Sequence, residues 1–216
     1  MTESESGPAG WSSRPGCKID FSSFVPAVTA NCLPVEFVSR SGFKLHAAMQ
    51  TWQFPVQNIG AADLGSNVGG FVQCLLSAGA ARVYAVDTGY GVLAWKLRKD
   101  PRVVVMERVN ALHVRLPEKV DLVTVDTGWT PQEKILPAAA ALLKTGGHIL
   151  TLIKPHYESV EARRQKGVLT AAQSLAVLRQ VLGQVGAAGL RVCGVVQSPL
   201  AGHGGNLEYV AHLQIA

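Results

Sequence analysis

The chain has 216 residues, of which 48% are hydrophobic and 16% charged, enough for one well-filled α/β domain with little left over. Its formal net charge of +5 is compatible with a polyanionic partner but does not require one. The sequence contains no candidate membrane span or signal peptide, and the four cysteines lack paired or metal-ligand spacing. These features argue against a membrane protein, a disulfide scaffold or a metal site, and favour a cytoplasmic protein with reduced thiols.

The N-terminal part of the chain differs in composition from the rest. Residues 1–16 are rich in Ser, Gly and Pro, which predicts a disordered or loosely attached segment. The apolar pieces that follow are too short for a domain of their own. We therefore expect a partly disordered N-terminal extension over residues 1–37 and one folded domain over residues 38–216. A helical pattern opens that domain at residues 44–52.

Beyond Gly60, strand-like and helix-like segments alternate along the chain. Several apolar runs lack period-two alternation, which is typical of parallel strands buried on both faces. Strands are expected near residues 59–63, 82–86, 102–106, 121–125, 147–153, 190–197 and 207–214, and helices near 69–78, 90–99, 132–143 and 169–187. This alternation predicts a doubly wound, mostly parallel α/β sheet.

The connection between the last two expected strands sets the direction of the final one. Residues 198–206 are rich in Pro and Gly and are too short for a crossover helix, so the last strand should run antiparallel to its predecessor. Ligands of such sheets bind beyond the carboxyl ends of the parallel strands. Glu208, at the start of the last strand, should face that same edge. The other acids and the lysine expected there are Asp63, Asp87, Asp126 and Lys154.

A glycine-rich turn with two flanking acids predicts a nucleoside cofactor. Residues 61–91 form a pattern of strand, turn, helix and strand, and Asp63 and Asp87 each end a strand. Glycines at 65, 69 and 70 allow a ligand to approach the backbone closely. An acid about twenty residues after the first strand is placed to accept ribose hydroxyls. Alternatively, Asp63 and the glycines could form a tight turn that binds no ligand. The second acid, Asp87, at the end of the next strand favours a binding site.

The details of the turn favour S-adenosylmethionine as the cofactor. The middle glycine of a dinucleotide G-x-G-x-x-G turn is absent, and Asp63 would repel a pyrophosphate but suits a cationic ligand. Asn110 follows the third strand and lies either beside the adenine or in a plain loop. The candidate cofactor residues are Asp63, Gly65, Ser66, Gly69, Gly70, Phe71, Asp87, Asn110 and Asp126.

From Val38 to the C-terminus the sequence resembles the hemolysin-A-type (TlyA-like) ribosomal RNA 2′-O-methyltransferases of the FtsJ-like group. The resemblance rests on residues 39–45, 63–71, 82–110, 152–158 and 198–213. It implies a seven-stranded Rossmann-like methyltransferase sheet with a reversed last strand. Members usually carry an RNA-binding S4 domain ahead of the methyltransferase, for which this chain has no room. A partner chain, the N-terminal segment or self-association could replace that domain.

The resemblance also implies a catalytic tetrad formed by Lys44, Asp126, Lys154 and Glu208. A ribose 2′-hydroxyl is a poor nucleophile until a base takes its proton, and lysine can do so only when neutral. Lys154 is the expected base because Pro155 ends its strand and holds it at the ligand edge. Asp126 would orient Lys154, while Lys44 and Glu208 would position the hydroxyl.

These readings predict an S-adenosylmethionine-dependent RNA 2′-O-methyltransferase that acts on ribosomal RNA. One alternative is a methyltransferase of small molecules or proteins, and another is a non-catalytic RNA- or ribosome-binding module that retains the fold. The absent G-x-G-x-x-G disfavours a dehydrogenase. For Trp95 and Trp129, a place in the core or at its rim is expected more often than base stacking. The candidate RNA-binding residues are Arg40, Arg163, Arg164 and Lys166; for the last three a flexible exposed loop is equally expected.

Overall fold

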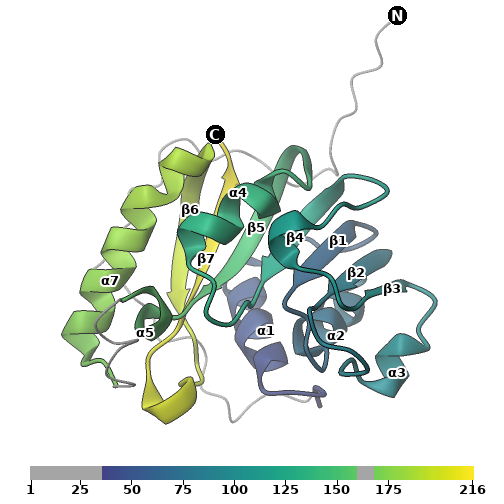
Figure 1. The fold of residues 1–216 in the computed structure, drawn as a ribbon, viewed down its shortest axis with the longest axis horizontal. Helices are drawn as coiled ribbons and strands as arrows, with labels where there is room; N and C mark the ends of the chain where they lie inside the picture. Colours follow the sequence, from purple (N-terminus) through teal and green to yellow (C-terminus); the bar gives the residue numbers. More distant parts are fainter. Residues whose placement is uncertain (1–35, 160–167) are drawn as a thin grey trace, which may run out of the picture.

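The computed structural model describes residues 36–159 and 168–216. Within these ranges the chain forms a seven-stranded sheet in the order β3-β2-β1-β4-β5-β7-β6 (Figure 1). The strands are β1 (Gly60–Leu64), β2 (Arg82–Val86), β3 (Val103–Met106), β4 (Val120–Val125), β5 (Leu143–Ile153), β6 (Leu190–Gln197) and β7 (Tyr209–Ile215). The first five pair in parallel, and β7 is antiparallel to both β5 and β6. The predicted doubly wound sheet with a reversed last strand is confirmed.

Helices cover both faces of this sheet, and each face has its own apolar core. The helices are α1 (Ser41–Trp52), α2 (Gly70–Ser77), α3 (Trp95–Arg98), α4 (Gln132–Ala140), α5 (Pro155–Glu158) and α7 (Ala171–Gln184), with the 3₁₀ turns η2 (Ala111–His113), η3 (Val185–Ala188) and η4 (His203–Gly205). Side chains of α4 and α7 pack on one face, and those of α1 and α2 on the other (Figure 1). Because successive strand residues point to opposite faces, Ala61 belongs to the second core while Ala62 and Leu64 belong to the first.

One edge of the sheet collects the segments that carry the candidate site. The pairing of Ile153 with Tyr209 brings the carboxyl end of β5 next to the start of β7. Pro155 begins α5 directly after β5, as expected from its fixed φ angle and missing N–H. Figure 1 shows α5, α3 and the connection between β6 and β7 at this same end of the molecule. None of the helices in the described ranges is long and apolar enough to cross a membrane.

The predicted helix at residues 90–99 is wrong for its first half. Only Trp95–Arg98 are helical, and Gly91 has a φ of +70°. The carboxylate of Glu107 accepts hydrogen bonds from the backbone N–H groups of Gly91 at 2.9 Å, Val92 at 3.2 Å and Leu93 at 3.4 Å. The left-handed backbone at Gly91 interrupts the predicted helix, and the bonds to Glu107 hold residues 91–93 as a loop.

Candidate active site

Asp63, at the end of β1, is a fully buried acid beside the glycine turn. Its Oδ1 accepts a hydrogen bond from the Thr124 hydroxyl at 2.7 Å, while Oδ2 has no hydrogen-bond partner among the described residues. Burial raises the pKa of Asp63 to about 8, and the nearby carboxylates of Asp126 and Asp87 act in the same direction. A buried carboxylate oxygen without a partner is costly unless a donor or a cation reaches it.

The glycines of the turn make room for neighbouring protein atoms, and their predicted contact with a ligand stays a prediction. A Cβ on Gly65 (φ +88°) would lie 2.7 Å from the backbone oxygen of Asp126. At Gly69 it would overlap Leu97, and at Gly70 the hydroxyls of Ser39 and Ser41. The three glycines therefore let the turn pack closely against β4, α3 and the start of α1.

Of the remaining predicted cofactor residues, two are at least partly exposed and two are buried. Asp87 accepts hydrogen bonds from the backbone N–H groups of Asn67 at 2.8 Å and Gly89 at 2.7 Å, which fixes the loop after β2 to the turn. Asn110 is exposed and accepts a hydrogen bond from Leu112 N at 3.0 Å, where it caps η2. Ser66 is buried. The side chain of Phe71 is 2% exposed and packs in the core of α1 and α2, so it is not available to a ligand.

The four residues of the predicted tetrad form two lysine–carboxylate pairs. Lys44 of α1 pairs with Glu208, and Lys154 Nζ lies 2.6 Å from Asp126 Oδ1. Lys154 also donates to the backbone oxygen of Thr127 at 3.4 Å. None of the four side chains is more than 17% exposed, so both pairs are largely withdrawn from water. In such surroundings their interaction is stronger than that of exposed pairs.

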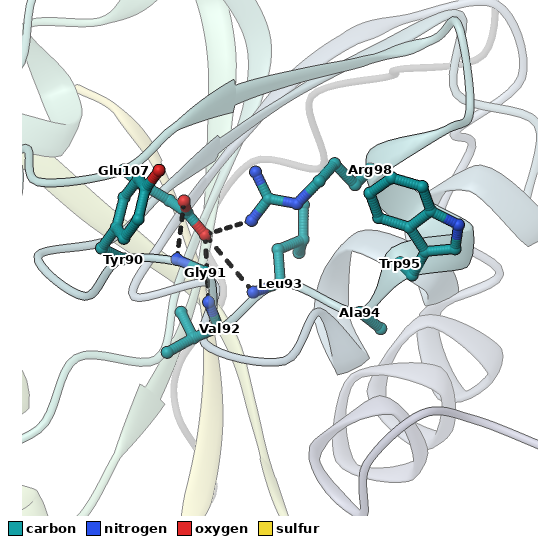
Figure 2. Close-up of a pocket in the computed structure, with 8 residues that line it drawn as sticks. All are labelled: Tyr90, Gly91, Val92, Leu93, Ala94, Trp95, Arg98 and Glu107. Atoms are coloured by element: carbon teal, nitrogen blue, oxygen red, sulfur yellow. Dashed lines mark hydrogen bonds and ion pairs between the residues drawn. The ribbon is translucent and has the colours of Figure 1, made fainter.

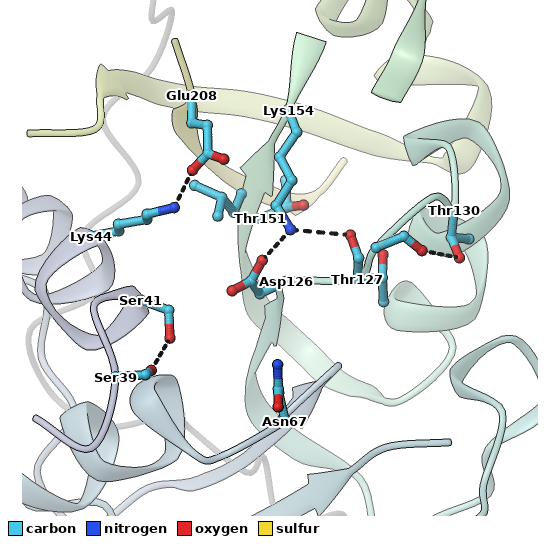
Figure 3. Close-up of polar contacts among 12 residues, drawn as sticks. Ser39, Ser41, Lys44, Asn67, Asp126, Thr127, Thr130, Thr151, Lys154 and Glu208 are labelled. Atoms are coloured by element: carbon cyan, nitrogen blue, oxygen red, sulfur yellow. Dashed lines mark hydrogen bonds and ion pairs between the residues drawn. The ribbon is translucent and has the colours of Figure 1, made fainter. Parts of the chain in front are cut away.

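The two pairs lie next to each other at the carboxyl edge of the sheet. Lys154 and Glu208 each lie one residue outside the β5–β7 ladder, which ends at the pair formed by Ile153 and Tyr209. Figure 3 shows both pairs side by side, with Thr151 between them and Asn67 of the glycine turn nearby. Asp126 N donates to Leu64 O at 2.9 Å, which ties the second pair to the turn.

Gly202 supports the position of Glu208 and was not singled out from the sequence. A Cβ on Gly202 would overlap the Glu208 carboxylate, so the acid packs directly on the backbone of the connection between β6 and β7. Gly202 N in turn donates to Asn206 O at 2.8 Å. The glycine-rich run at residues 202–205 is the sequence signal that could have indicated this close approach.

An exposed aromatic pair borders the Lys154–Asp126 pair. Trp129 is 64% exposed and has a φ of +60°, and its ring stacks on Tyr157 with centroids 4.4 Å apart. Lys154 Nζ lies 5.5 Å from the Tyr157 ring centroid. Trp129 therefore lies on the surface beside the tetrad, outside the core.

The predicted RNA-binding residues are described only in part. Arg40 is exposed and donates to the backbone oxygen of Ala201 at 3.1 Å, so it borders the same connection that carries Gly202. The predicted contacts at Arg163, Arg164 and Lys166 lie outside the described residues. In the described part of the chain, no group of three His, Cys, Asp or Glu side chains could hold a metal ion.

The site fits a cationic nucleoside cofactor. The unpartnered Oδ2 of Asp63 offers a buried acceptor to a positive group. Asp87, at the end of the neighbouring strand, is only partly buried and lies where an acid can accept ribose hydroxyls. The tetrad lies on the other side of the turn, where a reacting methyl group would have to be presented.

Comparison with known proteins identifies the family. The FtsJ-like methyltransferase family matches residues 37–215. The 16S/23S rRNA (cytidine-2′-O)-methyltransferase TlyA of Mycobacterium tuberculosis is 38% identical over 188 residues, 82% of this chain and 68% of that protein. Hemolysin A of Brachyspira hyodysenteriae is 33% identical over 187 residues, 84% of this chain and 78% of that protein. A solved protein of Streptococcus thermophilus, assigned as a hemolysin, has a TM-score of 0.80 at 33% identity and covers 86% of this chain and 69% of its own. The chain belongs to the FtsJ-like methyltransferase family, whose methyl donor is S-adenosylmethionine.

Proposed function

We propose that this protein is an RNA 2′-O-ribose methyltransferase whose substrate is ribosomal RNA. The observation that carries the proposal is the meeting of two largely buried lysine–carboxylate pairs, Lys44–Glu208 and Lys154–Asp126, at one edge beside the glycine turn. The TlyA relative, named for cytidine-2′-O methylation of 16S and 23S rRNA, supports this substrate class. The net charge of +5 is in keeping with a polyanionic substrate.

The proposed mechanism assigns each pair a separate task. S-adenosylmethionine, when bound, would supply a methyl group activated by its positive sulfur; the bond from sulfur to the methyl carbon breaks as the new bond forms, and S-adenosylhomocysteine is the leaving group. Lys154, in its neutral form, accepts the proton of the 2′-hydroxyl as the oxygen forms its bond to the methyl carbon. Asp126 fixes the direction of the Lys154 amine through their 2.6 Å contact. Lys44, held by Glu208, donates a hydrogen bond to the hydroxyl oxygen and aligns it for in-line attack.

Asp63 and Asp87 are proposed to bind the cofactor. Asp63 offers its unpartnered oxygen to a positive group of the ligand. Asp87 accepts the ribose hydroxyls through the lone pairs left free by its two backbone hydrogen bonds. The proposal includes a cytoplasmic location, where ribosomal RNA is found. It also includes a partner chain or self-association that supplies further RNA contacts.

The decisive experiment follows labelled methyl groups from S-adenosylmethionine into ribosomal subunits, naked ribosomal RNA, total protein and small metabolites. We expect label in RNA at a ribose, where it protects the neighbouring phosphodiester bond from alkaline cleavage. Replacement Lys154→Ala should lower the rate by about a hundred- to ten-thousandfold, the usual contribution of a general base. Label in protein or metabolites alone would support the small-molecule or protein alternative, and no transfer by the wild type would support the non-catalytic module.

Lys144→Ala is a matched control for this experiment. Lys144 lies on the same strand, β5, and pairs with Asp121 at 3.1 Å, but at the opposite edge of the sheet. The Lys144→Ala substitution therefore removes another lysine–aspartate pair without touching the proposed site. Equal losses for Lys144→Ala and Lys154→Ala would mean that the effect comes from stability, and the catalytic assignment would fail.

A further inference from the structure

A second surface, outside the residues assigned to catalysis and cofactor binding, combines exposed aromatic rings with positive charge. Tyr90 is 71% and Trp95 69% exposed, and both border a hollow of about 550 Å³. We call this the Tyr90–Trp95 surface, and Figure 2 shows the residues that line its hollow. They are Tyr90, Gly91, Val92, Leu93, Ala94, Trp95, Arg98 and Glu107.

Each of the two exposed rings carries a cation on one side. Lys99 Nζ lies 4.7 Å from the Trp95 ring centroid, and Arg108 Cζ lies 4.1 Å from the Tyr90 ring centroid. Arg108 has a φ of +57°, a left-handed backbone conformation that residues other than glycine rarely adopt. The backbone conformation therefore gives no reason for an arginine at this position. Because both rings are more than two-thirds exposed, a face of each is open to a further planar group.

The loop between the two rings is rigid. Glu107 accepts three backbone hydrogen bonds from this loop and a fourth from Arg98 Nη2 at 2.5 Å, as the dashed lines in Figure 2 show. The hydrogen bond from Gly91 N is the largest cause that lowers the pKa of Glu107. Leu93 and Leu97 are buried against Gly69, and Ala94 N donates to Val68 O at 3.1 Å. The loop therefore holds the two rings outward from the sheet. Because the loop is already ordered, little conformational entropy is lost when a ligand binds to the rings.

The Tyr90–Trp95 surface has a net positive charge, because its ion pairs cancel and three cations remain. Glu107 neutralises Arg98, and Asp100 neutralises Arg102 at 2.7 Å. Lys96, Lys99 and Arg108 are exposed and form no ion pair within the described residues. Open aromatic faces next to uncompensated cations are what proteins use to bind single-stranded nucleic acid, with bases on the rings and phosphates on the cations.

The surface lies at the same edge of the sheet as the tetrad. It follows the carboxyl ends of β2 and β3, whereas the tetrad follows those of β4 and β5. At about 4.8 Å between neighbouring strands, β5 and β3 are roughly 20 Å apart. Figure 1 shows α3 and α5 at this end of the molecule, on opposite sides of the strands β1 and β4. An RNA strand that reaches the tetrad can therefore extend to α3.

We propose that the Tyr90–Trp95 surface binds a single-stranded segment of the substrate RNA, with bases stacked on Tyr90 and Trp95 and phosphates held by Lys99 and Arg108. This inference rests on the proposed function and adds the place where RNA beyond the methylated nucleotide is held. The surface positions the substrate and takes no part in the chemical step.

The test measures binding of a fluorescent single-stranded RNA of mixed sequence, about twenty nucleotides long, by anisotropy at several salt concentrations. Trp95→Ala and Tyr90→Ala should each weaken binding about five- to hundredfold, the effect of losing one stacked base. Lys99→Gln should lower the slope of log affinity against log salt by about one. Binding of S-adenosylmethionine and the rate at saturating RNA should not change.

Control variants separate this inference from the proposed function. Lys119→Gln removes an exposed lysine at the opposite edge of the sheet and should leave the RNA affinity unchanged. If the wild type methylates RNA while the Tyr90 and Trp95 variants bind RNA normally, the inference is overturned and the function stands. If the wild type neither binds nor methylates RNA, the proposed function itself fails.

Two further outcomes would also overturn the inference. A loss of affinity for intact ribosomal subunits but not for protein-free RNA would indicate a contact with ribosomal protein. A loss of S-adenosylmethionine binding would indicate that the loop belongs to the cofactor pocket. Should Trp95→Ala fold poorly, Trp95→Phe combined with Lys99→Gln keeps an aromatic ring at this position and still tests the charge of the surface.

Discussion

The backbone of Gly202 packs closely against the Glu208 carboxylate, because a Cβ at this position would overlap it. Gly202 does not have a positive φ, so alanine is excluded there only by the carboxylate that it would overlap. The end of a glutamate side chain can move aside, although here the move breaks a largely buried ion pair. The carboxylate would then leave its place beside Lys44, and that lysine would lose its orientation.

Replacement Gly202→Ala should therefore lower kcat about a hundredfold at temperatures where the variant is folded, the effect of displacing a positioning group by about 1 Å. Loss of the largely buried contact between Lys44 and Glu208 should also lower the melting temperature. Steady-state kinetics with ribosomal RNA and thermal unfolding measure the two quantities. Gly183→Ala in α7, where a new Cβ meets nothing within 4 Å, is the control. Full activity of Gly202→Ala would show that the exact position of Glu208 is not required.

The proposed contact of Asp63 with the cofactor predicts that cofactor binding depends on pH. Because burial raises its pKa to about 8, Asp63 is mostly protonated at neutral pH in the free protein. A positive group of S-adenosylmethionine beside it favours the carboxylate, so binding releases a proton below pH 8. The affinity for the cofactor should rise by up to about tenfold for each pH unit as the pH approaches 8, and then level off.

Calorimetric titrations in two buffers of different ionisation enthalpy measure the released proton directly. Asp63→Asn cannot ionise, so it should bind more weakly and show neither proton release nor the rise in affinity. An unchanged pH dependence in Asp63→Asn would mean that another group is responsible.

Most strands and helices could be predicted from local sequence patterns. The strands were found within a few residues because each is an apolar run bounded by polar residues or glycine. The reversal of β7 followed from the short connection at residues 198–206. The helix predicted at 90–99 was mostly wrong because the acceptor that holds this loop, Glu107, lies 14 to 16 residues further along the chain.

The same limit applies to the candidate site. Asp63, Asp126 and Lys154 could be placed from local patterns, since each follows an apolar strand. Lys44 and Glu208 are 164 residues apart, and only the family resemblance brought them together before the structure did. The neighbours of Gly69 and Gly70 belong to other elements, so no local pattern indicates why a side chain is excluded there.

A buried histidine of β5, His148, and a partly buried histidine of β7, His212, link these strands to the segment that follows α1. His148 Nδ1 of β5 and His212 Nε2 of β7 are 2.7 Å apart, and Phe54 packs edge-on against both rings. Burial is the largest cause that lowers their pKa values, to about 3 for His148 and about 4 for His212, with Arg191 acting in the same direction. One ring must donate and the other accept, and the lowered pKa values keep both rings neutral near pH 7 in the folded state.

These shifts predict a stability maximum near pH 6.5. Below that pH the unfolded chain binds protons at both histidines while the folded state does not, so the free energy of unfolding falls as the pH decreases. Asp63 acts in the opposite sense, because its folded-state pKa is raised from 3.8 to about 8. Between pH 4 and 8 the folded state keeps a proton that the unfolded chain releases, so its contribution falls as the pH rises.

Urea unfolding from pH 5 to 8.5 separates the two contributions by variant. Below the maximum, the unfolded chain gains two histidine protons while the folded state keeps one proton on Asp63. The free energy of unfolding of the wild type should therefore fall by about 1.4 kcal/mol for each pH unit below the maximum. His212→Gln removes one of the titrating rings and should flatten this acid limb. Asp63→Asn should flatten the limb above pH 6.5 and leave the acid side steeper. If both variants kept the wild-type profile, buried groups elsewhere would govern the pH dependence, and neither the histidine pair nor Asp63 would titrate as its surroundings require.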